Sequence, residues 1–155
     1  MFHGKFLMAG LLALSLSPAL QAADLVDATS PETLLQSFRG FGSAELEKSG
    51  NGDPQIIGRI DGNKFGVYFY GCENNRDCKD VQITAGWSGV SLPLDKINGW
   101  NRDKRFCKVY MDGEGDPLLE MDLNLRFGVT RANLDDTLEY WQICLRDFNS
   151  EMLGR

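Results

Sequence analysis

Four cysteines, Cys72, Cys78, Cys107 and Cys144, are the residues whose type and spacing most clearly suggest chemistry. An even number of cysteines suggests disulfide bonds, and four cysteines allow three pairings. Cys72 and Cys78 enclose a short polar loop, Glu73 to Asp77, so we favour a bridge between these two. A zinc site made of four thiolates would use closer Cys-x-x-Cys pairs, and the spacing therefore argues against one.

Cys107 and Cys144 leave two alternatives open. Cys107 lies in a predicted strand, on the same face as Val109, and Cys144 lies one helical turn from Trp141 in a predicted helix. They could form a second bridge, or they could be two small buried apolar residues. The choice depends on the distance between their Cα atoms, which the sequence does not give.

The second candidate for chemistry is an acidic cluster, Asp112, Glu114 and Asp116, with Glu120 and Asp122 beyond it. Carboxylates could bind Ca²⁺, but an EF-hand loop has glycine at its sixth position and glutamate at its twelfth. Counted from the first aspartate of the cluster, these positions hold proline and leucine. We interpret the cluster as a hairpin turn followed by a solvated acidic strand face. A carboxylate-based hydrolase is an alternative, because paired carboxylates can cleave glycosidic bonds.

Histidine occurs once, as His3, at the start of an apolar N-terminal segment. Removal of that segment excludes Ser–His and Cys–His nucleophile pairs and any zinc site with an imidazole ligand. The other residue types that could catalyse a reaction, carboxylates, lysine, tyrosine and serine, stand in no recognisable motif. We therefore predict no catalytic residues, no metal site and no cofactor, and a protein that is not an enzyme.

The N-terminal segment, residues 1–22, has the layout of a secretory signal peptide. A weakly positive start precedes an apolar run from Phe6 to Leu16, which is shorter than the roughly 20 residues of a membrane-spanning helix. We expect cleavage after Ala22, with Ala23 as the second choice. The mature chain, residues 23–155, would then be a periplasmic protein without a membrane anchor.

The charge of the mature chain limits its partners. Cleavage removes only Lys5 among the charged residues, which leaves 15 basic and 22 acidic residues and a net charge of −7. A negative chain is a poor partner for nucleic acid or an anionic membrane, because both attract positive charge. We expect a protein or peptide partner, and a homodimer is a further alternative.

The hydrophobic pattern is clearest in the last third of the chain. Apolar and polar residues alternate from Leu119 to Leu125, which predicts a half-buried strand. The period then lengthens, which predicts an amphipathic helix with Thr130 as its N-cap. The apolar stripe of this helix consists of Leu134, Leu138, Trp141, Leu145, Phe148 and Met152.

The remaining patterns predict a single α+β domain. A first helix is expected to begin at Ser30 as N-cap, with Pro31 at its first position. Alternation and turn composition predict strands over 56–60, 64–70, 81–86 and 106–111, a short helix over 92–100, and an additional early strand over 44–48. These elements give helices on one face of an antiparallel sheet of about five strands.

Aromatic and basic side chains are the candidates for binding a partner, because aromatic residues are enriched at interface hot spots. Tyr68 and Tyr70 share the less apolar face of their strand. Arg102 and Arg105 follow the short helix, where the helix dipole favours basic residues, and they could also dock an acidic partner. The candidate set is Tyr68, Tyr70, Trp87, Trp100, Arg102 and Arg105.

Five motifs, in order along the mature chain, resemble the YbjN family. They are GDPxIxGRIDG (52–62), FYGCxxxxxC (69–78), WNRxxRF (100–106), GDPxLEMDLNL (115–125) and GVTRxNLDDTLxxW (128–141). The resemblance implies a sensory-transduction regulator with a fold similar to type III secretion chaperones, α-β-β-β-α-β-β-α. It implies a regulatory or chaperone-like protein-binding domain. A small-ligand-binding protein and a structural envelope protein are the alternatives.

Overall fold

The computed structural model describes residues 24–155. The predicted signal peptide and its cleavage at Ala22 or Ala23 lie outside these residues. Within them, no helix has both the length and the apolar character needed to cross a membrane. The elements are β1 (Leu25–Val26), α1 (Pro31–Arg39), β2 (Ser43–Lys48), β3 (Pro54–Ile60), β4 (Asn63–Tyr70), β5 (Asp80–Gly86), α2 (Leu94–Asp103), β6 (Lys108–Met111), β7 (Pro117–Asn124), β8 (Val129–Thr130), α3 (Arg131–Asp147) and the π-helical turn η1 (Phe148–Leu153).

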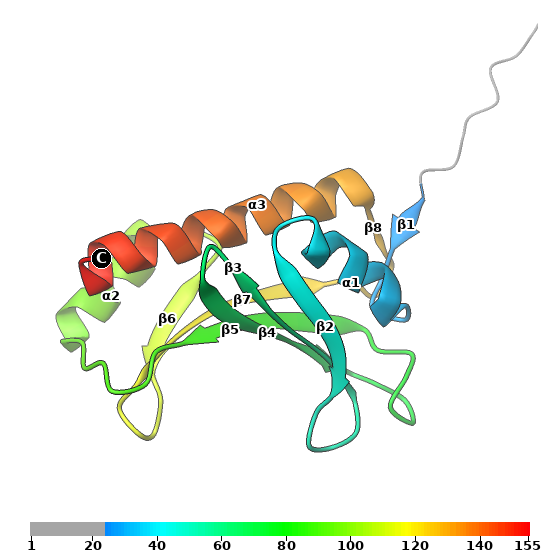
Figure 1. Ribbon diagram of the computed structural model, residues 1–155, viewed down its shortest axis with the longest axis horizontal. Helices are drawn as coiled ribbons and strands as arrows, with labels where there is room; N and C mark the ends of the chain where they lie inside the picture. The colour runs from blue at the N-terminus through cyan, green and yellow to red at the C-terminus, as the bar shows by residue number, and fades with distance from the viewer. Residues whose placement is uncertain (1–23) are drawn as a thin grey trace, which may run out of the picture.

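The domain has two layers, a curved antiparallel sheet and the helices that lie on one of its faces (Figure 1). The strand order is β2-β3-β4-β5-β7-β6, so the first four strands form a meander and β7 inserts between β5 and β6. The predicted α+β fold is confirmed. The sheet has six strands rather than about five, because the early strand over 44–48 is real and forms the edge strand β2.

The core lies between the sheet and α3. All six residues of the predicted stripe on α3 and η1 are buried, and Leu138, Trp141 and Phe148 are fully so. From the sheet, β4 buries Phe65, Val67 and Phe69 in the alternation expected of a central strand. The predicted cap is also present, since the Asn133 N–H donates to Thr130 Oγ1 at 3.2 Å.

The structure differs from the sequence-based expectation at several element ends. Ser30 occupies the N-cap position of α1 but makes no side-chain capping hydrogen bond. The start of the helix is therefore favoured only by Pro31, whose fixed φ matches that of a helix. Phe106 lies outside β6, because its positive φ of 70° is incompatible with a strand. A second sheet of two short strands, β1 and β8, and the turn η1 were not anticipated.

Both cysteine pairs lie at disulfide-bonding distance. The sulfur atoms of Cys72 and Cys78 are 2.11 Å apart, and this pair closes the loop between β4 and β5. Those of Cys107 and Cys144 are 2.06 Å apart and join the residue before β6 to α3. Of the two alternatives for Cys107 and Cys144, the structure therefore fits the bridge.

Asn101, in the last turn of α2, closes the outer edge of β6. Its Nδ2 donates to the Val109 carbonyl at 2.8 Å, and its Oδ1 accepts from the Val109 N–H at 2.8 Å. One side-chain amide thus makes the two hydrogen bonds that a further strand would make. A sheet edge covered in this way cannot pair with another chain at that residue.

Replacement of Asn101 by alanine is expected to lower the free energy of unfolding by about 1–3 kcal/mol, because both Val109 backbone groups lose a partner. Urea denaturation measures the change. Asn98→Ala is the matched control, since Asn98 is an exposed residue of the same helix, and it should have little effect. Equal stabilities for the two variants would show that the edge contact contributes nothing.

Candidate functional site

The helices leave one face of the sheet uncovered, and we call it the open sheet face (Figure 1). Strand pairing sets its residues in rows across the strands. Tyr68 on β4 and Tyr70 at its end are 36% and 49% exposed there, and Tyr110 on β6 is 39% exposed. The central row, from β3 to β6, consists of Ile57, Gly66, Thr84, Glu120 and Lys108.

A hydrogen-bonded network orders one half of this face. Tyr110 Oη donates to Glu120 Oε1 at 2.7 Å, and Lys108 Nζ lies 3.2 Å from Glu120 Oε2 and 3.4 Å from Asp122 Oδ2. Gln82 Nε2 donates to Asp122 Oδ1 at 2.8 Å. Side chains from β5, β6 and β7 are therefore joined in one hydrogen-bonded network.

Glu120 is the one member of this network that is buried, with 6% of its surface exposed. The prediction of a solvated acidic strand face is wrong for this residue, because Lys108 and Tyr110 of the neighbouring strand both contact its carboxylate. Asp112 behaves as predicted for a turn, since its Oδ1 accepts from the N–H groups of Glu114 and Asp116.

The network shifts the titration of its members. The hydrogen bond to Glu120 is the main cause that raises the pKa of Tyr110 to about 12, with burial as the second cause. Burial, with the Glu120 and Asp122 charges behind it, raises the pKa of Tyr70. The hydrogen bond to Glu120 raises the pKa of Lys108. These shifts favour the neutral tyrosines and the charged lysine.

Tyr110 should therefore make stability depend on pH in the alkaline range. An unfolded tyrosine titrates near about pH 10. Because the folded pKa is higher, the contribution of Tyr110 is complete below pH 10 and is lost as the pH rises towards 12. Denaturant midpoints between pH 9 and 12 should fall more steeply for the wild type than for Tyr110→Phe. Parallel curves would contradict this linkage.

A shallow hollow of about 410 Å³ lies on the open sheet face beside this network. Gly66 and Gly86 make it possible, because a Cβ atom at these positions would lie 3.0 Å from the Tyr68 ring and 2.7 Å from Leu118 Cδ2. The Tyr68 and Leu118 side chains thus pack directly against Gly66 and Gly86, respectively. The lining of the hollow is about equally apolar and polar, and it consists of Glu47, Gln55, Ile57, Lys64, Phe65, Gly66, Tyr68, Thr84, Gly86 and Leu118.

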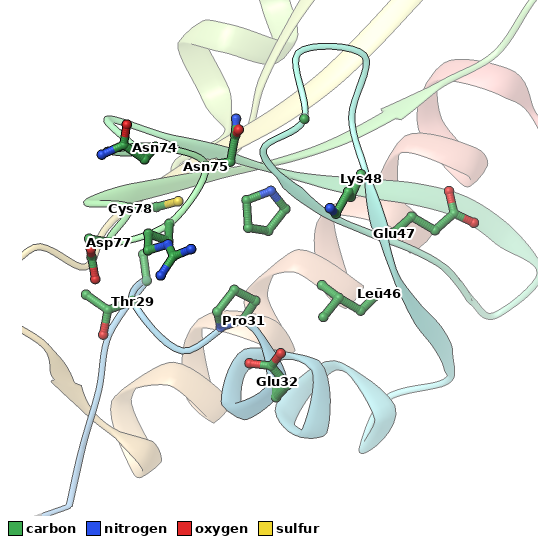
Figure 2. Close-up of a pocket in the computed structure, with 14 residues that line it drawn as sticks. Thr29, Pro31, Glu32, Leu46, Glu47, Lys48, Asn74, Asn75, Asp77 and Cys78 are labelled. Carbon is green, nitrogen blue, oxygen red and sulfur yellow. The ribbon is translucent and has the colours of Figure 1, made fainter.

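A larger pocket, of about 730 Å³, lies at the end of the sheet that carries the disulfide loop. Figure 2 shows its walls: Pro31 and Glu32 at the start of α1, Leu46 and Lys48 on β2, and the loop with Asn75. Asn75 Nδ2 donates to the Asn51 carbonyl at 3.1 Å and to Asp53 Oδ1 at 2.9 Å. These bonds tie the loop to the β2–β3 hairpin along one side of the pocket.

The family model of YbjN, described as "Putative bacterial sensory transduction regulator", matches residues 30–153. The chain belongs to the YbjN family. A search of curated proteins found none that matches it. Membership supports a regulatory role in general, because the family is described as one of regulators and not of enzymes.

The YbjN match includes every element from α1 to η1 and so contains all the predicted binding residues. Of these, the structure brings together Tyr68 and Tyr70. Trp100 was predicted to face a partner, and this is wrong: it is 4% exposed, and its Nε1 donates to the Cys107 carbonyl at 3.0 Å. Trp87 is half-buried and stacks on Phe148 at a centroid distance of 4.4 Å.

The two candidate arginines lie away from the open sheet face, after the apolar part of α2. Arg102 pairs with the carboxylate of Asp103 through two contacts of 2.8 Å, and Arg105 lies in the exposed turn that follows. Sequence analysis missed Lys108 and Tyr110 in this YbjN chain. Their alternation with Val109 places them opposite the core, but only the pairing of β6 with β7 brings them to Glu120.

Proposed function

We propose that this chain is an exported, non-enzymatic regulatory domain that binds a protein or peptide partner across its open sheet face. The observation that carries the proposal is the presence of three exposed tyrosines, Tyr68, Tyr70 and Tyr110, on the same sheet face as a shallow hollow of mixed polar and apolar lining. Tyrosines are enriched at interfaces because one side chain offers both apolar area and a hydroxyl group.

The shape and order of the face support a macromolecular partner. The hollow is shallow and lies on a broad sheet, so a partner contributes one side chain to it while other residues contact the tyrosines. The network from Tyr110 to Asp122 is ordered beforehand, which lowers the entropic cost of binding. Two disulfides in so short a chain support export, because such bonds persist in oxidising compartments.

Photo-crosslinking in intact cells tests the proposal. A photoreactive amino acid placed at Tyr68 or Tyr70 should capture a defined partner, and one placed at Glu139, on the exposed side of α3, should not. Thr84→Arg fills the hollow from an exterior position and should abolish capture. Equal capture at all three positions, or capture that Thr84→Arg leaves unchanged, would contradict it. Capture of a second copy would support the homodimer instead.

Binding of a small ligand is the second candidate function, and the pocket of Figure 2 is the observation that favours it. Its volume falls within the range of about 300–1,000 Å³ typical of ligand sites. Its walls carry negative charge from Glu32 and Asp77 and positive charge from Lys48 and Arg76. A panel of amino acids and dipeptides in a thermal-shift assay tests it. A stabilising compound should lose its effect in Lys48→Ala, and an unchanged effect would assign binding elsewhere.

A further inference from the structure

Phe106 is presented to solvent by a strained turn on the helical side of the domain. Its φ is 70°, and the Cys107 N–H donates across it to the Arg105 carbonyl at 2.8 Å. A γ-turn with positive φ is rare, and a bulky residue in that region is an outlier. The side chain is nevertheless 53% exposed, so burial of the ring in the core does not explain the conformation.

The surrounding structure holds this turn firmly in place. Cys107 is bonded to Cys144 on α3, and its carbonyl accepts the Trp100 Nε1–H at 3.0 Å. The Phe106 ring stacks on Tyr140 with centroids 4.2 Å apart and planes inclined by 25°. Strained backbone that is held by its neighbours in this way clusters at functional sites.

Phe106 forms one wall of a small notch of about 240 Å³ between the end of α2 and α3. We call it the Phe106 notch. Ile143, which is 39% exposed, lies at its rim, and the buried Trp100 and Cys144 contribute to its lining. The notch therefore combines an apolar interior with an exposed apolar rim.

Most charges around the notch are already paired. Lys104 Nζ lies 3.1 Å from Asp147 and 2.6 Å from Glu151, and Arg102 is paired with Asp103. Arg105 is different, because within residues 24–155 no carboxylate lies within 4.0 Å of its guanidinium. The guanidinium lies 5.1 Å from the centre of the Phe106 ring instead. A stacked guanidinium keeps N–H donors free for a carboxylate.

We propose that the Phe106 notch docks a segment of a partner protein in which an aspartate or glutamate adjoins a large apolar side chain. The carboxylate pairs with Arg105, and the apolar side chain enters the notch between Phe106 and Ile143. Charge complementarity with the Arg105 guanidinium, the one lining residue of the notch that carries a charge without an ion pair, selects an acidic partner. This surface lies on the helical layer and is independent of the open sheet face, so it goes beyond the function proposed above.

An NMR titration of the isotope-labelled mature chain tests the proposal. The probe is the blocked tetrapeptide acetyl-Asp-Leu-Phe-Asp-amide, and its counterpart has lysine in place of aspartate. The acidic peptide should shift the Trp100 Nε1–H and Ile143 methyl signals in a saturable way. Arg105→Glu should weaken this binding by about tenfold or more, since a charge-assisted pair is lost, and should instead bind the lysine peptide.

Arg126→Glu is the matched control, because Arg126 is an exposed arginine whose guanidinium also lies over a phenylalanine ring, that of Phe127 at 5.4 Å, and it does not line the notch. It should leave the affinity for the acidic peptide unchanged, and thermal unfolding checks that both variants are folded. Equal shifts with both peptides, or binding that Arg105→Glu leaves intact, would overturn the proposal. The proposal would also be overturned if sedimentation showed that the wild type is a dimer and that Arg105→Glu dissociates it. Crosslinking at Tyr68 should be unaffected by Arg105→Glu, which separates this test from that of the open sheet face.

Discussion

Replacement of Cys107 and Cys144 together by alanine is expected to lower the free energy of unfolding by about 4 kcal/mol. This bridge spans 37 residues, which include the whole of β6 and β7. A crosslink over so long a stretch removes many conformations from the unfolded chain, and its loss returns them. Guanidinium denaturation of the oxidised wild type and the double variant measures the difference.

The Cys72–Cys78 bridge provides the internal comparison. It spans six residues, so its removal by the corresponding double alanine variant should cost only about 2 kcal/mol. The order of the two losses is the critical result. A larger loss for the short bridge would show that native contacts of the cysteines, rather than the entropy of the unfolded chain, determine the contribution of each bridge.

Replacement of Phe148 by alanine is expected to lower the free energy of unfolding by about 3–5 kcal/mol, the usual range for a large buried aromatic residue. Phe148 is fully buried where α3 passes into η1. Its ring stacks on Trp87 with centroids 4.4 Å apart and meets Trp100 edge-on at 5.5 Å. The variant therefore loses apolar burial and two aromatic contacts, and leaves a cavity among the helices and the sheet.

Phe127→Ala is the control for Phe148→Ala. Phe127 lies between β7 and β8 and is 84% exposed, so the same change in chemistry removes almost no buried area. Its effect on the denaturation midpoint should be close to zero. If both variants lose similar stability, the position of Phe148 at the centre of the core is not the source of its effect.

The sequence predicted the parts of the fold that repeat over many residues. The stripe from Leu134 to Met152 contains six apolar residues in helical spacing, and each of them is buried. Short elements have no such repeat. β1 and β8 contain two residues each, and their pairing across the domain leaves no periodicity to detect.

Contacts between segments far apart in the chain account for most of what was missed at the candidate site. The alternation in β7 placed Glu120 on the polar face correctly, but its burial depends on Lys108 and Tyr110 arriving from the adjacent strand. Trp100 was a candidate for partner binding only because aromatic residues are enriched at interface hot spots. Its burial follows from β6 and α3 closing over α2, which local pattern does not reveal.

The two disulfides join neighbouring cysteines in the sequence, first with second and third with fourth. A chain that is synthesised and released from its N-terminus presents Cys72 and Cys78 before the other two, within a meander whose strands pair in succession. Cys107 and Cys144 follow later in the chain, on either side of β7. The next cysteine that follows Cys72 in the chain, and the next that follows Cys107, is therefore its native partner. Oxidation of the cysteines in the order of their synthesis gives the native pairing without the slow exchange of mismatched disulfides.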